Sequence, residues 1–452
     1  MKRQFSILLH LLILLALSAC GINPASPSPM PSPTATTQPS PVSSCSSGEV
    51  AAPDVVDTWS PPPEAASITP LSCDEIGGVF AYDSQAPLDI QEMSRRQEEG
   101  VTLIDLTYAS PMGGRVPATL VVPDGAGLFA GMIYMHGMVD TRQTWIRAAA
   151  TYARMGAVVL LIDAPYTRRP TWKTYPLNYT EQDRREQIQL IVDLRRGIDL
   201  LLSRPEVDPE RLAYVGYSYG GSMGGLLAGV EDRLKAYVLQ VGDGGLVTHL
   251  TTGPKFRDAW LARPEDERRQ WVEWMWPIEP IHYVGCASPA ALLFQNGTLD
   301  IYVPPTLGLR YQEAGSEPKT VRWYGVGHML SMDGAAFQDQ AEWLSERIGI
   351  SVGRLAVPVD PQVLAAYAGR YQFSPGSVVT ICVDGTRIFL QVPNEPGLVE
   401  IAGDFELLAV SEDHFHLEVS NFEITFYRND SGKVDRLVMV QNGETFDAKK
   451  VP

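Results

Sequence analysis

Two overlapping G-x-S-x-G patterns place a serine between glycines, as a nucleophilic serine requires in a sharp turn from strand to helix. The first pattern surrounds Ser218 and the second surrounds Ser222. The strand-like run Arg211–Tyr217 ends directly before Ser218, and small residues with helical character follow it. Ser222 falls one helical turn later, where we expect its hydroxyl to bond a backbone carbonyl. We therefore predict that Ser218 is the nucleophile.

Ser218 needs a histidine to take its proton and an acid to orient that histidine. In the strand-to-helix arrangement, the acid and the histidine follow the serine in that order. Asp300 lies in a loop after the strand-like sequence ALLFQ, whereas the second candidate, Asp243, follows the preceding strand and Asp333 comes too late. Of the seven histidines, only His328 lies between Asp300 and the C-terminal segment. The predicted triad is Ser218, Asp300 and His328, which would form and hydrolyse an acyl-enzyme.

The oxyanion that develops during acyl transfer needs two preorganised N–H donors. In this arrangement the residue after the nucleophile supplies one of them, which here is the backbone of Tyr219. The second is expected after the strand-like sequence GMIYMHG, where the pair His136-Gly137 leads into Met138. We favour the Met138 amide; the alternative role of the His-Gly pair is a tight turn.

The elements that could position these side chains alternate along residues 67–352, which we assign to one catalytic domain. Short apolar runs, typical of parallel strands buried on both faces, are separated by amphipathic stretches such as Glu181–Arg204 and Gly334–Arg347. The pattern predicts a doubly wound, mostly parallel α/β sheet. Its strands are expected at Thr102–Tyr108, Pro117–Val122, Ala130–Tyr134, Ala157–Ile162, Arg211–Tyr217, Ala236–Val241, Ala290–Gln295 and Thr320–Tyr324.

A helix-rich insertion over about residues 243–288 interrupts this alternation and carries Trp260, Trp271, Trp274 and Trp276. It could be a cap that shapes an acyl pocket, or its tryptophans could form the small core of the cap itself. The sequence does not choose between these alternatives.

Residues 355–452 change to short alternating runs such as SVVTIC, RIFLQV and EITFYR, separated by Asp-Gly and Asn-Gly turns. These are hairpin signals, and they predict six to eight antiparallel strands in a small barrel-like β domain. No catalytic set of residues is visible in it. The domain could gate substrate, bind the cell wall, drive oligomerisation or only stabilise the protein.

The N-terminus predicts export and anchoring. Two basic residues precede the apolar run Phe5–Leu17, which is too short to span a bilayer and fits a signal peptide. The run ends in Leu-Ser-Ala-Cys, which looks like a bacterial lipobox, so we predict a signal peptide and lipobox over residues 1–20, with cleavage before Cys20 and lipidation of its thiol. Residues 21–66 are rich in Pro, Ser and Thr, a composition that predicts an extended tether. We expect an extracytoplasmic protein held at the cell membrane by its lipid anchor only.

The formal net charge of −17 argues against a nucleic-acid partner and against adhesion to anionic lipid headgroups. No HExxH sequence or metal-type cysteine spacing occurs, so we expect no metal and no cofactor. Cys45 and Cys73 could pair in an oxidising compartment, although the sequence does not decide this. Cys286 and Cys382 sit among apolar residues and are expected to be buried and inert. The oligomeric state is not predicted.

Four sequences in this order, YMHGM, PEVDPERLAYVGYSYGG, QNGTLD and GHML, resemble motifs of the dienelactone-hydrolase and prolyl-oligopeptidase-like branch of the α/β-hydrolase superfamily. The resemblance covers about residues 104–348 and implies a serine hydrolase. Prolyl oligopeptidases carry an N-terminal β-propeller that restricts entry to peptides, and residues 67–135 are too few for one. The C-terminal runs, with LAAYAGRYQF, resemble the lipocalin-like domain behind some penicillin-binding-protein-like serine hydrolases.

These observations favour a carboxylic-ester hydrolase that acts on a small-molecule ester or other acyl substrate. A peptidase or amidase with the same triad is the second enzymatic alternative. The contrasting class is a non-catalytic binding lipoprotein that kept a hydrolase fold. The intact order of serine, acid and histidine argues against that class.

Overall fold

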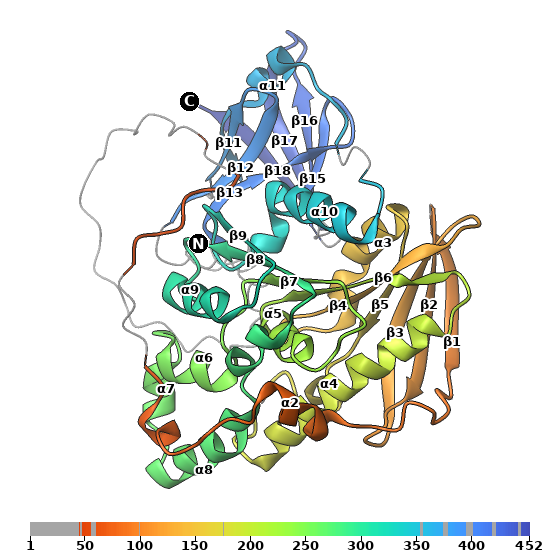
Figure 1. Ribbon diagram of the computed structural model, residues 1–452. Coiled ribbons are helices and arrows are strands. Elements are labelled where there is room, and N and C mark those ends of the chain that lie inside the picture. The colour runs from red at the N-terminus through yellow and green to blue at the C-terminus, as the bar shows by residue number, and fades with distance from the viewer. Residues whose placement is uncertain are drawn as a thin grey trace.

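The computed structural model describes most of the chain as two packed parts, an α/β body and a β body (Figure 1). The described residues are 45, 48–55, 60–98, 100–174, 176–352, 356–373, 378–394, 401–417, 422–441 and 444–452. The predicted signal peptide and Cys20 lie outside these residues, so cleavage and lipidation stay predictions. Within the described part of the chain, no helix is both long enough and apolar enough to cross a bilayer.

The α/β body is built on a nine-stranded sheet with the order β1-β2-β3-β5-β4-β6-β7-β8-β9. Strands β4 to β9 pair in parallel, whereas β1, β2 and β3 pair antiparallel and extend one edge. The strands are β1 (Gln91–Glu98), β2 (Val101–Ala109), β3 (Arg115–Pro123), β4 (Phe129–Met135), β5 (Ala157–Ile162), β6 (Val207–Tyr217), β7 (Ala236–Gln240), β8 (Ala291–Gly297) and β9 (Lys319–Tyr324). The prediction of a doubly wound, mostly parallel α/β sheet is confirmed.

Helices cover both faces of this sheet. α3 (Ile146–Arg154) and α10 (Gly334–Ile348) share a core with one face, and α4 (Glu181–Leu202), α5 (Tyr219–Ala228) and α9 (Pro305–Ala314) share a core with the other. Alternate residues of β5 enter opposite cores, and all six are buried. This two-sided burial explains why the parallel strands read as continuous apolar runs.

The predicted cap lies between β7 and β8 and consists mainly of α6 (Leu246–Thr252), α7 (Arg257–Leu261) and α8 (Glu265–Met275). Trp271 is fully buried among apolar residues of the cap and α4, and its Nε1 donates to Asp183 at 2.8 Å. Residues of α6, by contrast, line a cavity beside the candidate site. The two alternatives therefore describe different parts of one insertion: tryptophans form its core, and α6 shapes a pocket.

The β body is a nine-stranded sheet with the order β13-β12-β11-β10-β18-β17-β16-β15-β14, antiparallel throughout. Its end strands β13 and β14 follow each other in the chain, and the sheet curls into a nearly closed barrel (Figure 1). The short helix α11 (Pro361–Tyr367) precedes the strands β10 (Gly369–Phe373), β11 (Val378–Asp384), β12 (Arg387–Val392), β13 (Gly403–Glu406), β14 (Leu408–Ala409), β15 (His414–Leu417), β16 (Phe422–Arg428), β17 (Val434–Gln441) and β18 (Glu444–Val451). The predicted antiparallel barrel-like domain is confirmed, with nine strands in place of the six to eight expected.

Two disulfides join segments that are far apart in the chain. Cys45 pairs with Cys382 and Cys73 pairs with Cys286, with Cα atoms 5.9 Å apart in both bonds. The possible bond between Cys45 and Cys73 is therefore absent, and the expectation that Cys286 and Cys382 are inert is wrong, although Cys382 is buried as expected. The partners are separated by 337 and 213 positions, and only the fold brings them together.

Part of the predicted tether over residues 21–66 contacts the folded part of the protein. Glu49 forms an antiparallel bridge with Tyr324 on the edge strand β9, and the Val50 N–H donates to Trp323 O at 2.7 Å. An open sheet edge offers unpaired backbone groups, so this contact needs no large apolar side chains. The prediction that the whole segment stands apart from the folded part is therefore wrong at Cys45, Glu49 and Val50.

Candidate active site

Ser218 lies between β6, which ends at Tyr217, and α5, which begins at Tyr219. Its φ of 54° falls in the left-handed region, which is strained for a residue with a side chain. The turn is so tight that a Cβ on Gly216 would collide with the backbone oxygen of Gly220. The flanking glycines are therefore required by the turn that presents the serine at the N-terminus of α5.

Ser218, His328 and Asp300 form a continuous hydrogen-bonded chain. His328 Nε2 lies 2.9 Å from Ser218 Oγ, and His328 Nδ1 lies 2.7 Å from Asp300 Oδ2. Asp300 Oδ1 accepts the backbone N–H groups of Tyr302 and Val303. Because a carboxylate only accepts, the hydrogen of the ring lies on Nδ1, and Nε2 presents its lone pair to the serine hydroxyl. In this geometry His328 can take the proton of Ser218.

The three side chains come from loops at the carboxyl ends of parallel strands: Ser218 follows β6, Asp300 follows β8 and His328 follows β9. Asp300 and His328 are only 3% and 5% exposed, so little water competes for their hydrogen bond. The rings of Tyr302 and Tyr217 lie 5.0 and 5.5 Å from the His328 ring, measured between centroids. The Tyr217 hydroxyl also donates to the His328 carbonyl at 2.9 Å. The histidine is thus packed against two tyrosine rings and held by a hydrogen bond to its backbone.

The loop after β4 is fixed through one carbonyl. Gly137 O accepts from His136 Nδ1 at 2.7 Å and from the Tyr166 hydroxyl at 3.1 Å. His136 Nε2 accepts the Ala164 N–H, and burial lowers the pKa of His136, so a neutral ring protonated on Nδ1 satisfies both contacts. Because the peptide bond is planar and trans, the Met138 N–H points away from this carbonyl.

Both predicted oxyanion donors lie beside the serine. Met138 and Tyr219 line the same cavity as Ser218. A Cβ added to Gly137 would lie 3.3 Å from Ser218 Cβ, so the Gly137–Met138 peptide passes directly against the nucleophile. Tyr219 opens α5, where backbone N–H groups lack partners within the helix. The two residues predicted to supply the oxyanion donors therefore lie next to the nucleophile.

Ser222 belongs to a second cluster of serine, aspartate and histidine. Its Oγ accepts the Asp243 N–H at 2.9 Å and donates to Asp243 Oδ1 at 3.1 Å. Asp243 Oδ2 lies 2.6 Å from His249 Nδ1 on α6. Burial lowers the pKa of His249, but the Asp243 carboxylate outweighs it and the net pKa is raised. The expectation that Ser222 bonds a backbone carbonyl is wrong, because Asp243 supplies both partners, and Asp243 itself is paired with a histidine other than His328.

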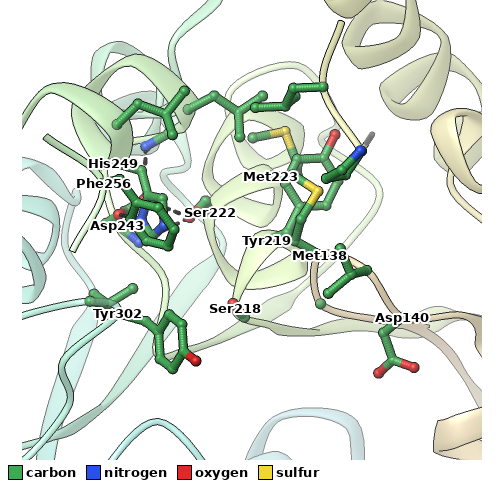
Figure 2. A pocket seen from close by; sticks show the side chains of 18 of the residues that line it. Met138, Asp140, Ser218, Tyr219, Ser222, Met223, Asp243, His249, Phe256 and Tyr302 are labelled. Atoms are coloured by element: carbon green, nitrogen blue, oxygen red, sulfur yellow. Dashed lines mark hydrogen bonds and ion pairs between the residues drawn. The ribbon is translucent and has the colours of Figure 1, made fainter. Parts of the chain in front are cut away.

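A cavity of about 310 Å³ opens beside Ser218. Figure 2 shows Met138 and Met223 to one side of the serine and Phe256 to the other. Leu246 and Leu250 of α6 complete a mainly apolar wall. A short apolar chain could therefore lie against the cap while its carbonyl carbon meets the serine.

Two further polar groups at the cavity carry no sequence motif that would mark them. Asp140 accepts from the Thr141 N–H and from Trp145 Nε1, both at 2.8 Å, and burial raises its pKa. His249 is an isolated histidine in the cap, and only its position shortly after Asp243 hints at the pair they form. Over the described residues, no group of three or more His, Cys, Asp or Glu is placed to hold a metal ion.

Comparison with known families finds a match in each of the two parts of the chain. Residues 174–349 match the prolyl oligopeptidase family. This part of the chain is therefore similar to that family. The matched residues include Ser218, Asp300 and His328, whereas Met138 lies ahead of them. Residues 354–450, which include the β body, match a domain of unknown function, DUF3471.

Similar individual proteins include a curated relative and several solved structures. The relative, named uncharacterized peptidase YuxL of Bacillus subtilis (strain 168), is 29% identical over 150 residues, which are 31% of this chain but only 22% of the relative. Acetyl xylan esterases from Paenibacillus sp. R4 and Thermoanaerobacterium sp. JW/SL YS485 have TM-scores of 0.49 at 21% and 17% identity. Each match covers 61% of this chain and 93% of the esterase.

Proposed function

We propose that this protein is a serine hydrolase that cleaves small carboxylic esters, with Ser218 as nucleophile, His328 as general base and Asp300 as the orienting acid. The observation that carries the proposal is the hydrogen-bonded chain from Asp300 through His328 to Ser218 at the wall of an apolar cavity. A serine hydroxyl is a poor nucleophile unless a positioned base takes its proton. The strained turn at Ser218 supports the same reading, because backbone strain of this kind gathers at functional sites.

The reaction follows from these positions. As Ser218 Oγ attacks the ester carbonyl, its proton passes to His328 Nε2, and Asp300 stabilises the resulting imidazolium. The oxyanion accepts hydrogen bonds from the Tyr219 and Met138 amides, each worth about 10²–10³-fold in rate at comparable sites. The alcohol leaves with the proton from His328. Water then attacks the acyl-enzyme, again with His328 as base, which frees the acid and restores Ser218.

The cavity supports a small substrate. Its volume of about 310 Å³ lies at the lower end of the range for ligand pockets, and its walls are mainly apolar. Its notable polar feature is the pair of His249 and Asp243, which offers one ring edge to a polar group on the substrate. Short acyl chains therefore fit better than long ones.

Cleavage of a peptide or other amide is the second candidate, favoured by the match of residues 174–349 to the prolyl oligopeptidase family. The triad would serve either bond, since His328 would protonate a leaving amine in the same way as an alcohol. The cavity favours the ester, because it accommodates one small group rather than an extended chain.

Initial rates on p-nitrophenyl esters of rising acyl length and on aminoacyl-anilides test the proposal, with Ser218→Ala as the control. We expect ester hydrolysis whose kcat/KM is highest for short acyl chains and is lost in Ser218→Ala. Higher kcat/KM on the anilides than on any ester would assign the site to a peptidase. Binding of the esters without turnover would instead support the non-catalytic alternative.

We also propose that the protein works outside the cytoplasm, attached to the membrane through lipid on Cys20. Two disulfides support this location, because such bonds persist in oxidising compartments. Cys20→Ala should therefore block lipidation and leave a precursor that retains residues 1–19. A Cys20→Ala protein of mature mass that remains in the membrane fraction would contradict the anchor.

A further inference from the structure

The loop that carries His328 runs from the end of β9 to α10 and lies against the β body. The backbone N–H of Gly327, the residue directly before His328, donates to Ala402 O at 2.8 Å. Ala402 is fully buried and stands directly before β13. A backbone hydrogen bond from the β body therefore reaches the peptide unit next to the histidine.

The contact at this point is close enough to require a glycine. Gly403 has a φ of 141°, and a Cβ added to it would lie 2.7 to 2.9 Å from Val326 Cγ1, Cα and Cβ. Two of these three atoms cannot rotate away, so a side chain at residue 403 would have to displace the backbone of Val326. Val326 precedes His328 by two residues, and its displacement would be passed to the histidine.

The far end of the loop meets the same strand of the β body. Asp333 Oδ1 accepts the Glu406 N–H at 3.4 Å, and a Cβ on Gly334 would lie 3.1 Å from Glu406 O. Glu406 is in turn held by an ion pair with Arg387 on β12, 2.6 Å between Nη2 and Oε2. Strand β13 therefore contacts the loop both before and after His328.

The strand that leads into the loop is tied to the β body by a second route. Glu49 and Val50 pair with the last residues of β9, as described above. A few residues earlier, Cys45 is bonded to Cys382 on β11 of the β body. Strand β9, which leads into the loop that carries His328, is thus also connected to the β body through the N-terminal segment.

We propose that the β body is a working part of the hydrolase site, in which Ala402 and Gly403 position the loop that carries His328. The inference rests on the proposed function of His328 and assigns a role to the domain matched by residues 354–450. Neither residue lines the cavity beside Ser218; both act through the backbone of Val326 and Gly327. Displacement of a catalytic group by about 1 Å can cost about 10²-fold in rate, so a small shift of this loop is enough to matter.

Gly403→Ala in the full chain tests the proposal, with Gly432→Ala as the matched control. Gly432 also has a positive φ, 78°, and lies in the same domain, but a Cβ added there meets no atom within 4 Å. Both variants therefore carry backbone strain, and only Gly403→Ala pushes on Val326. Rates are expressed per active site titrated with a fluorophosphonate, so that any misfolded fraction is not counted.

We expect Gly403→Ala to lower kcat per titrated site about 10- to 100-fold with KM within about threefold of the wild type. Gly432→Ala should stay within about twofold on both parameters, as an open surface position would. Equal kcat values for the two variants would overturn the proposal, since strain without contact would then act as strongly as contact.

Hydrogen–deuterium exchange of the peptide over residues 325–334 reads the same loop without any substrate. We expect faster exchange in Gly403→Ala than in the wild type and in Gly432→Ala, because the Gly327 N–H loses its acceptor. This readout separates the inference from the proposed function. A wild type without turnover would contradict the proposed hydrolase function but not the contact between the β body and this loop. Unchanged exchange, or faster exchange with unchanged kcat, would refute a positioning role for the β body.

Discussion

Asp333→Asn should stabilise the protein against unfolding more strongly near pH 8 than near pH 4.5. Asp333 is fully buried at the N-terminus of α10, where its Oδ1 accepts the N–H groups of Ala335 and Glu406 at 3.3 and 3.4 Å. Burial raises its pKa from the ordinary 3.8 to about 7. The folded protein therefore keeps a neutral carboxyl at the contact between its two bodies up to about neutral pH.

The magnitude follows from the difference between the folded and unfolded pKa values. Between pH 3.8 and about 7, unfolding of the wild type releases a proton from Asp333. The stability from this group is therefore fully present below pH 3.8 and is lost as the pH rises through 7. The two values differ by about three, which corresponds to at most about 4 kcal/mol. Asn does not ionise and keeps an acceptor at the helix N-terminus. The free energy of unfolding of Asp333→Asn relative to the wild type should therefore rise by about 3 kcal/mol from about pH 4.5 to about pH 8.

Urea unfolding of the disulfide-intact protein, followed by tryptophan fluorescence at several pH values, measures this advantage. Asp360→Asn is the matched control, because Asp360 caps α11 in the same way, accepting the Gln362 N–H, but is exposed. Its effect should remain below about 1 kcal/mol throughout. A difference between Asp333→Asn and the wild type that stays constant with pH would refute the presence of a buried neutral carboxyl at this contact.

Asp300→Asn should keep the fold and lower kcat/KM by about 10⁴-fold, because His328 loses the partner that sets its tautomer. Asp243→Asn should cost far less, and the reverse ranking in steady-state kinetics would make Asp243 the acid. Cys45→Ser should lower the free energy of unfolding by roughly 2–5 kcal/mol, because its bond to Cys382 closes a very long loop. Removal of all residues before residue 65 should lower the free energy of unfolding by at least as much. A truncated protein with unchanged urea unfolding would show that the N-terminal segment contributes nothing to stability.

The sheet and the three residues of the candidate triad could be predicted because their signals are local. The strand β5 reads as an unbroken apolar run since both of its faces are buried. The glycines around Ser218 are visible in the sequence because the turn tolerates nothing larger. Asp300 and His328 then followed from chain order, which the parallel sheet imposes on its loops.

The features that sequence reasoning missed depend on contacts between distant segments. Strand β1 carries only exposed side chains, so no apolar alternation marks it. The bond between Cys45 and Cys382 and the pairing of Glu49 with β9 join the start of the chain to its last third. Gly403 reads as an ordinary loop glycine, and its role against Val326 exists only in the packed structure. Local pattern carries no information on such pairings.

Identification of the residue that reacts with a fluorophosphonate tests the central claim most directly. The full chain would be labelled, digested and analysed by mass spectrometry, alongside Ser218→Ala and Ser222→Ala. The account predicts one adduct on Ser218, none in Ser218→Ala, and labelling retained in Ser222→Ala, whose hydroxyl is engaged by Asp243. An adduct on Ser222, or labelling of Ser218→Ala at the level of the wild type, would contradict the assignment of Ser218 as the nucleophile.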